Sequence, residues 1–207
     1  MNYLEFARTL NLFPCFSTRE IEKYFPVFDR RRLVEWQAKG YLEKIRNGYY
    51  CFSDQSHDKN LQYYISNRIY RPSYVSLESA LAWYGFLPEA VFQTMACTTR
   101  KPQRYETPRG IFVYRHLKSE LYFGYRLIEW KRWRLAMAEP EKALIDYLYL
   151  HTEIRAREDL LALRWNMFAI NENISHSKLS QYEKVIASAA LSRRLKLLTE
   201  LLNAEIG

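Results

Sequence analysis

Three consecutive arginines, Arg30, Arg31 and Arg32, are the residues whose type and spacing most clearly suggest a chemistry. A guanidinium group carries a permanent charge and a planar set of donors that matches both a phosphate and the two acceptors of guanine. Gln37 follows within roughly two helical turns, and a glutamine amide can pair with adenine. These side chains predict that a short helix recognises an anionic partner.

A solvated helix surface is the plainer interpretation of such a run, because charged side chains usually lie in water beside an acidic neighbour. Two features favour binding. Three cations at the start of a helix oppose its macrodipole, which an anionic ligand would relieve. A basic hairpin follows and suits contact with a phosphate backbone. The residues predicted to contact DNA are Arg30, Arg31, Arg32, Gln37, Lys39, Lys44, Arg46 and Asn47.

Three short helices must position these residues. Apolar residues at helical spacing predict the first helix over residues 3–13. Ser17 and Glu20 have the capping-box pattern that opens a second helix. Asp29 is placed to cap a third helix over residues 30–39. The arginines therefore fall at the start of the third helix.

A tight hairpin is predicted directly after these helices. Gly40 takes the helix-terminating position that favours a positive φ. Residues 41–46 and 49–52 have the character of strands, and Asn47-Gly48 is a two-residue turn between them. This order is typical of a winged helix-turn-helix, in which the third helix enters the major groove of DNA. We expect this DNA-binding domain to cover residues 1–60, ending in a polar linker.

Residues 61–207 are expected to form a larger α+β domain with a small, mainly antiparallel sheet and C-terminal helices. Strand-like segments rich in aromatic and β-branched residues alternate there with helical patterns, and residues 101–109 are predicted to be a loop. Strands are predicted over residues 92–98, 110–117, 122–130 and 133–138. Helices are predicted over residues 61–70, 76–84, 140–148, 156–166, 177–188 and 190–203.

The formal net charge of +8 suggests an anionic partner, but the excess lies in the middle of the chain. Residues 1–60 carry ten Lys and Arg against eight Asp and Glu, whereas residues 61–137 carry twelve against five. The cations of this middle segment could form a second nucleic-acid surface. They are explained equally well as an exposed rim that keeps the protein soluble. Its residues are Arg100, Lys101, Arg104, Arg109, Lys131 and Arg132.

Several function classes find no support in the sequence. Apolar stretches are too short for a membrane span and the start lacks a basic signal-peptide pattern, so we expect a cytoplasmic protein. No phosphate loop, zinc-helix motif or nucleophile elbow occurs, which predicts no enzyme and no cofactor. The three cysteines and four histidines lack metal-ligand spacing. Glu139, Glu141 and Asp146 are interpreted as helix-start and helix-surface residues.

Three stretches together resemble the AbiEi-like antitoxin and transcriptional-regulator family of type IV toxin-antitoxin systems. They are residues 33–42 running into 46–50, residues 74–81 and residues 138–146, and the likeness spans about residues 5–150. The resemblance implies a winged-helix domain that binds inverted repeats of its own promoter. It also implies a C-terminal domain that counters a nucleotidyltransferase-like toxin without necessarily forming a stable complex with it.

Three hypotheses follow. The leading one is a DNA-binding transcriptional regulator that autoregulates as an antitoxin, with double-stranded operator DNA as its partner. The alternative is an RNA-binding or nucleic-acid-processing protein that acts through the basic middle segment. The third is a protein-interaction module whose winged helix no longer binds DNA, which the near-neutral charge of residues 1–60 leaves open.

Overall fold

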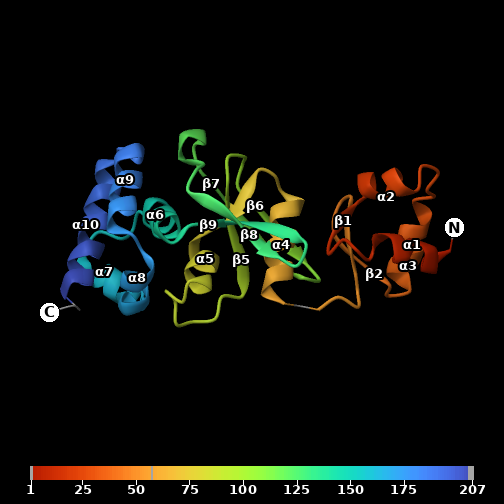
Figure 1. The fold of residues 1–207 in the computed structure, drawn as a ribbon, viewed down its shortest axis with the longest axis horizontal. Coiled ribbons are helices and arrows are strands. Elements are labelled where there is room, and N and C mark those ends of the chain that lie inside the picture. Colours follow the sequence, from red (N-terminus) through yellow and green to blue (C-terminus); the bar gives the residue numbers. More distant parts are fainter. Residues whose placement is uncertain (1, 57, 205–207) are drawn as a thin grey trace.

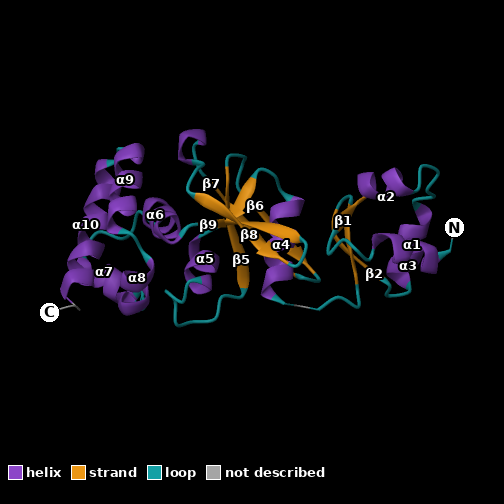
Figure 2. Ribbon diagram, viewed as in Figure 1, coloured by secondary structure: helices purple, strands orange, loops and turns teal. Residues whose placement is uncertain are grey.

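The computed structural model describes residues 2–56 and 58–204, and its fold is of the mixed α+β class that the sequence predicts (Figures 1 and 2). Three groups of elements lie in a row along the long axis of the molecule: N-terminal helices with a small sheet, a central larger sheet, and a group of C-terminal helices. We call residues 2–56 the N-terminal unit and residues 58–204 the second unit.

The N-terminal unit contains three short helices followed by a hairpin. Its sheet has the order β1-β3-β2, so that the short strand between the first two helices pairs with the second strand of the hairpin. The elements are α1 (Tyr3–Leu10), β1 (Phe16–Ser17), α2 (Thr18–Tyr24), α3 (Arg31–Ala38), β2 (Leu42–Arg46) and β3 (Tyr49–Phe52).

Local sequence signals determine where these helices begin. The predicted capping box is confirmed, because the Ser17 backbone N–H donates to Glu20 Oε2 at 2.8 Å and Ser17 Oγ accepts from the Glu20 N–H. The third helix begins one residue later than predicted, with Arg30 at the N-cap position. Asp29 still accepts a hydrogen bond from the Arg31 backbone N–H at 3.0 Å. Gly40 has the expected positive φ of 71°.

The second unit holds the remaining helices around a six-stranded sheet. The elements before the C-terminal helices are α4 (Lys59–Ile69), β4 (Ser73–Val75), α5 (Leu77–Trp83), β5 (Gln93–Thr98), β6 (Gln103–Thr107), β7 (Gly110–His116), a 3-10 turn (Ser119–Leu121), β8 (Tyr125–Trp130) and β9 (Trp133–Ala138). The C-terminal helices are α6 (Pro140–Leu150), α7 (Arg157–Ala162), α8 (Met167–Asn173), α9 (His176–Ile186) and α10 (Ala189–Ala204).

The central sheet has the order β6-β7-β5-β4-β9-β8, with three antiparallel and two parallel pairings. Helices cover both of its faces. Tyr114 on β7 donates a hydrogen bond to the Ser66 carbonyl of α4 at 2.8 Å, whereas Tyr74 on β4 donates to Asp146 of α6 on the other face (Figure 1). The sheet is thus mostly antiparallel as predicted, but it is enclosed between two helical layers.

Three segments of the second unit differ from the prediction. Residues 101–109, expected to be a loop, contain β6, an edge strand that pairs with β7 from Gln103 to Thr107. Most of its residues are exposed, so it lacks the alternation of apolar and polar residues by which strands are recognised. Strand β4 and helix α8 were also not predicted.

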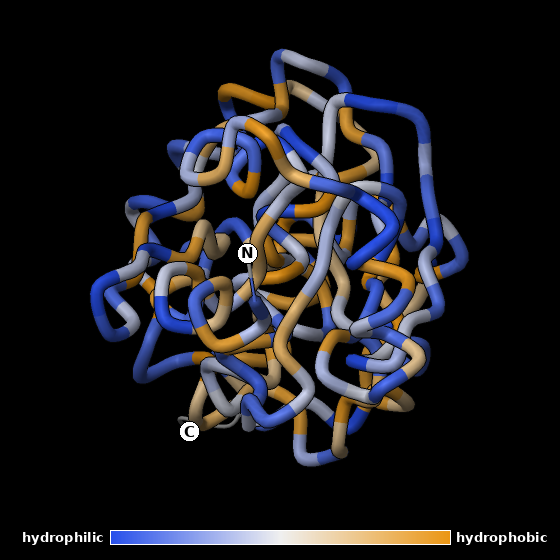
Figure 3. The backbone as a smooth tube through the Cα atoms, turned by 90° about the vertical axis from the view of Figure 1, so that its right-hand side faces the viewer, coloured by the Kyte–Doolittle hydropathy of each residue, from blue (hydrophilic) through white to orange (hydrophobic). Residues whose placement is uncertain are grey.

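The apolar residues form two core clusters, one within residues 6–52 and a larger one centred on the second unit. Figure 3, which looks along the molecule from its N-terminal side, shows hydrophobic segments gathered inside and hydrophilic ones on the outer loops. Three buried residues of the N-terminal unit, Cys15, Ile45 and Cys51, belong to the larger cluster. Among the described helices, none combines the length and apolar character that crossing a bilayer requires.

Candidate nucleic-acid interface

Helix α3 presents its arginines to solvent while its opposite face is buried. Leu33 and Trp36 are each only 2% exposed and pack in the N-terminal core, where the Trp36 ring lies 4.5 Å from that of Phe6. The side chains of Arg30 and Arg31 are 68% and 92% exposed. Burial of the apolar stripe therefore fixes the helix so that its N-terminal cations face outward.

Each of these exposed cations has an acidic neighbour. Arg30 Nε donates to Glu22 at 3.1 Å, and Arg31 Nε donates to Asp29 at the same distance. The hydrogen bond from Arg31 holds the pKa of the Asp29 carboxyl below its usual value. Since exposed ion pairs are weak in water, a phosphate group can replace these partners.

The remaining predicted residues of α3 are less available. Lys39 is exposed but pairs with Glu35 one turn earlier at 2.7 Å. Arg32 and Gln37 are half-buried, and the Gln37 amide donates to the Leu33 carbonyl of its own helix at 2.6 Å. Gln37 would have to break this bond in order to pair with adenine.

The β2–β3 hairpin divides its predicted contacts between two sides. Lys44 and Asn47 are exposed. Arg46 instead turns toward the second unit, where its guanidinium donates to the Ile69 carbonyl and lies 5.1 Å from the Tyr105 ring centre. A bulge at Ile45 in the β2–β3 pairing produces this turn and buries Ile45. Arg46 is thus already engaged within the molecule.

The turn of the hairpin does not project away from the N-terminal unit. Thr18, the first residue of α2, donates its backbone N–H to the Gly48 carbonyl at 2.9 Å. Gly48 has a φ of 80°, which side-chain-bearing residues rarely adopt. The turn therefore lies beside the start of α2, and the exposed cations of this face include Arg19 of that helix.

The second basic group is split by the fold. Arg100 and Lys101 lie in the β5–β6 turn, while Arg104 lies on edge strand β6 and pairs with Glu106 at 2.8 Å. Lys131 and Arg132 form the β8–β9 turn and belong to the opposite edge strand of the sheet. These cations were grouped together from the sequence, but they lie at opposite edges of the sheet and therefore do not form one surface.

Arg109 corrects the prediction of a surface cation. It is 1% exposed, and its guanidinium holds the two units together. It pairs with Glu43 of β2 and donates to the carbonyls of Phe52 and Gln55, each at 2.7 Å. We call this set of contacts the Arg109 clamp. A buried arginine with these partners is structural and cannot contact a nucleic acid.

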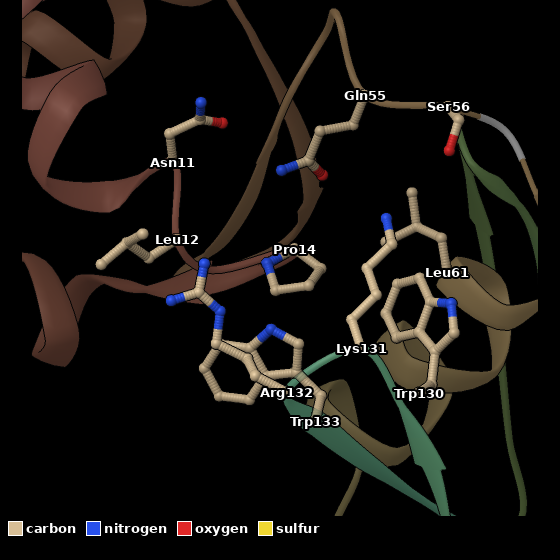
Figure 4. Close-up of a pocket in the computed structure, with 10 residues that line it drawn as sticks. All are labelled: Asn11, Leu12, Pro14, Gln55, Ser56, Leu61, Trp130, Lys131, Arg132 and Trp133. Atoms are coloured by element: carbon tan, nitrogen blue, oxygen red, sulfur yellow. The ribbon is translucent and has the colours of Figure 1, made fainter.

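Lys131 and Arg132 border a cleft between the units, shown in Figure 4, with a volume of about 300 Å³. Trp130 and Trp133 flank it, and Lys131 Nζ lies 4.9 Å from the Trp130 ring centre. Lys131 has a positive φ of 54°, which is unusual for a residue with a side chain. The other lining residues are Asn11, Leu12, Pro14, Gln55, Ser56 and Leu61.

Glu139 and Glu141 lie at the start of α6 as predicted, but Asp146 is not a helix-surface residue, contrary to the prediction. Asp146 is 1% exposed and accepts hydrogen bonds from Tyr74 at 2.8 Å and from Ser76 at 2.7 Å. It also pairs with Lys142, which is fully buried one turn earlier and donates to the Tyr74 hydroxyl. We call these four residues the buried quartet. The Lys-Asp spacing of four residues on a mostly apolar helix was the sequence signal for it.

Glu141 and Glu139 tie α6 to α9. Glu141 is 3% exposed and accepts from the Ser175 backbone N–H at 2.7 Å. Glu139 pairs with Lys178 at 2.7 Å and accepts a hydrogen bond from Tyr182. These contacts give the three carboxylates structural partners.

Metal-binding side chains are dispersed in the part of the chain that the structure describes, where no three His, Cys, Asp or Glu residues come together. His57 lies outside the described residues. All three cysteines are free and buried. Burial, together with the neighbouring Cys15, raises the pKa of the Cys51 thiol well above its usual value.

No protein-family model matches this chain, and no curated protein matches it.

Proposed function

We propose that the protein is a DNA-binding transcriptional regulator, in which residues 1–60 form a winged helix-turn-helix that inserts α3 into the major groove. The observation that carries the proposal is the orientation of α3, with Leu33 and Trp36 buried and Arg31 92% exposed at the helix start. The N-terminal residues of a recognition helix are those that reach base edges. Arg30, Arg31, Lys44 and Asn47 are the proposed contacts.

The arrangement around α3 supports the same function. Three helices precede a hairpin, and the small sheet joins β1 to that hairpin in the order β1-β3-β2. The turn of the hairpin lies against the start of α2, so its exposed residues stand on the same unit as the α3 arginines. Arg46 is left out of the proposed contact set because it bonds to the second unit.

We further propose an antitoxin role, which rests on the resemblance of residues 33–50, 74–81 and 138–146 to AbiEi-like proteins. In the fold the last two stretches meet in the buried quartet, since Tyr74 and Ser76 bond to Asp146. A cytoplasmic location and a nucleotidyltransferase-like toxin as partner belong to this proposal. Co-expression with a toxin encoded beside the gene tests it, and unrelieved toxicity would contradict it.

Fluorescence anisotropy of the full chain on its own upstream DNA tests the DNA-binding proposal. The full chain is needed because Cys15, Ile45 and Cys51 are buried against the second unit. We expect Arg30→Ala with Arg31→Ala to weaken specific binding by roughly tenfold or more, since a bidentate base contact contributes about 1–3 kcal/mol. The salt dependence should become shallower by about 0.9 for each lost phosphate contact.

The matched control replaces Arg155 and Arg157, two exposed arginines of the second unit, with alanine. This double variant removes the same charge and should bind like the parent protein. Equal affinity of the α3 variant and the control would contradict the assignment of α3.

A second candidate function, binding of single-stranded RNA, is favoured by the cleft of Figure 4. Two cations beside two indole rings are the combination that single-stranded nucleic acids use, with phosphates on the cations and bases on the rings. Lys131→Ala with Arg132→Ala should then abolish RNA binding and leave duplex DNA binding intact. RNA binding that survives this change would exclude the cleft.

A further inference from the structure

A second cavity lies within the second unit, away from both basic turns. Its volume is about 400 Å³, which falls in the range of small-ligand sites. Most of its wall is apolar or aromatic, and the segment from Leu87 to Gln93 forms one side. The other lining residues are Glu78, Met95, Tyr147, Ala162, Leu163 and Trp165.

Two polar groups of this wall have no hydrogen-bond partner in the described structure. One oxygen of the Glu78 carboxylate, Oε2, is buried and unpaired, and so is the indole N–H of Trp165. Trp165 is only 5% exposed. Buried polar groups in native proteins are nearly always satisfied, so an unpaired acceptor and an unpaired donor among the residues of one cavity wall set this wall apart from an ordinary core surface.

The Glu78 carboxylate has only a long contact to a basic group among the described ion pairs. His151 Nε2, at 4.0 Å, is the one basic group that approaches the carboxylate among the described ion pairs. The second ring nitrogen of His151, Nδ1, lies 2.9 Å from the Tyr147 carbonyl. Glu89 on the cavity wall and Glu153 near Tyr147 add negative charge, while the cations Lys59 and Arg104 bond to the Val91 carbonyl and the Gln93 amide oxygen of the wall.

Tyr147 reports the same electrostatic environment. Burial, followed by the Glu78 carboxylate, raises the pKa of its hydroxyl to about 12. Its ring stacks on His151 with centroids 3.9 Å apart and meets Trp165 edge to face at 5.1 Å. The cavity therefore combines a carboxylate with aromatic rings, and the faces of such rings attract organic cations.

Backbone geometry sets Glu78 in place. Leu77, which directly precedes it, is buried with a positive φ of 54°, a conformation that is unfavourable for a branched aliphatic residue. Such strain persists where the surroundings enforce it, and it is concentrated at functional sites. The strained residue of the β4–α5 connection thus directly precedes Glu78 of the cavity wall.

We propose that this cavity binds a small primary amine with an apolar or aromatic body. The ammonium group pairs with Glu78, and the body packs between Tyr147, Trp165 and Leu163. The site does not depend on the proposed DNA-binding function, because none of these residues belongs to the N-terminal unit.

Phenethylamine is the probe, with 3-phenylpropionate as the negatively charged analogue and 2-phenylethanol as the neutral one. Isothermal titration calorimetry of the full chain should detect the amine and show at least tenfold weaker binding of both analogues. In NMR spectra the indole N–H resonance of Trp165, assigned with Trp165→Phe, should shift as the amine is added.

Glu78→Gln should weaken amine binding at least tenfold and reduce the preference over the neutral analogue. Glu172→Gln, at an exposed glutamate of α8 outside the cavity, is the matched control and should bind like the parent. Leu163→Trp fills the cavity and should block the amine even if Glu78→Gln folds poorly. No amine binding at millimolar concentration, equal binding of the three probes, or retained binding in Glu78→Gln would each overturn the proposal.

Discussion

Replacing Arg109 with methionine tests whether one buried guanidinium holds the two units together. Methionine keeps most of the length and apolar volume of the side chain but cannot donate a hydrogen bond. The change removes the ion pair with Glu43 and the donors to the Phe52 and Gln55 carbonyls. All of these interactions join the β6–β7 turn, which contains Arg109, to the β2–β3 hairpin and the segment that follows it.

The size of the effect follows from the burial of each partner. Removing one member of a buried pair costs about 3–5 kcal/mol. The Glu43 side chain is 21% exposed and regains some hydration, which favours the lower half of that range. Removing the guanidinium also removes the cost of burying its charge, which offsets part of the cost of leaving the two carbonyls without a hydrogen bond. We therefore expect the free energy of unfolding to fall by about 3 kcal/mol.

Thermal and urea unfolding of the full chain measure this change. At this chain length each kcal/mol shifts Tm by about 2–4 °C, so Tm should fall by about 10 °C. Hydrogen exchange should quicken in the hairpin first. Arg104→Met is the matched control, because Arg104 lies on the adjacent strand with an exposed partner, and it should unfold like the parent. An unchanged midpoint for Arg109→Met would refute the clamp.

Two further predictions concern the core of the second unit. Asp146→Asn leaves the fully buried Lys142 without its counter-charge, so the free energy of unfolding measured in urea should fall by about 3–5 kcal/mol. The control Glu129→Gln, at an exposed glutamate, should change this free energy little. Similar unfolding midpoints for the two variants would contradict the role of the quartet. Burial raises the pKa of Tyr64 to about 12, so the folded state keeps a proton that the unfolded state releases above about pH 10. Stability should consequently decline as pH rises from about 10 to 12, by roughly 2 kcal/mol from this residue, and Tyr64→Phe should show a smaller decline; identical pH profiles would count against it.

The N-terminal unit was largely predictable because its signals are local. A capping box at Ser17, a glycine after the third helix and Asn47-Gly48 between two strands each act over a few residues. Their geometry appears in the structure within one residue of the expected place for α2 and α3. The exposure of Arg31 also followed directly from the burial of Leu33 and Trp36.

The interface between the units was not predictable, because its partners are far apart in sequence. Arg109 and Glu43 are both charged residues in polar segments, and nothing local distinguishes them from solvated side chains. Strand β6 was missed since an edge strand with polar residues on both faces has no period of two. Charge counted along the chain likewise grouped cations that the sheet places on opposite edge strands.

The apolar face that joins the units has a consequence for synthesis of the protein on the ribosome. The N-terminal unit leaves the ribosome first, but Cys15, Ile45 and Cys51 belong to a core cluster whose other buried members all come later in the chain, in α4 and β7 among other elements. Until about half of the chain has been made, these apolar residues are exposed and can contact other nascent chains. The Glu43 carboxylate also lacks its ion-pair partner, Arg109, during this period. A stalled or truncated product that ends before β7 should therefore be prone to aggregation and to proteolysis.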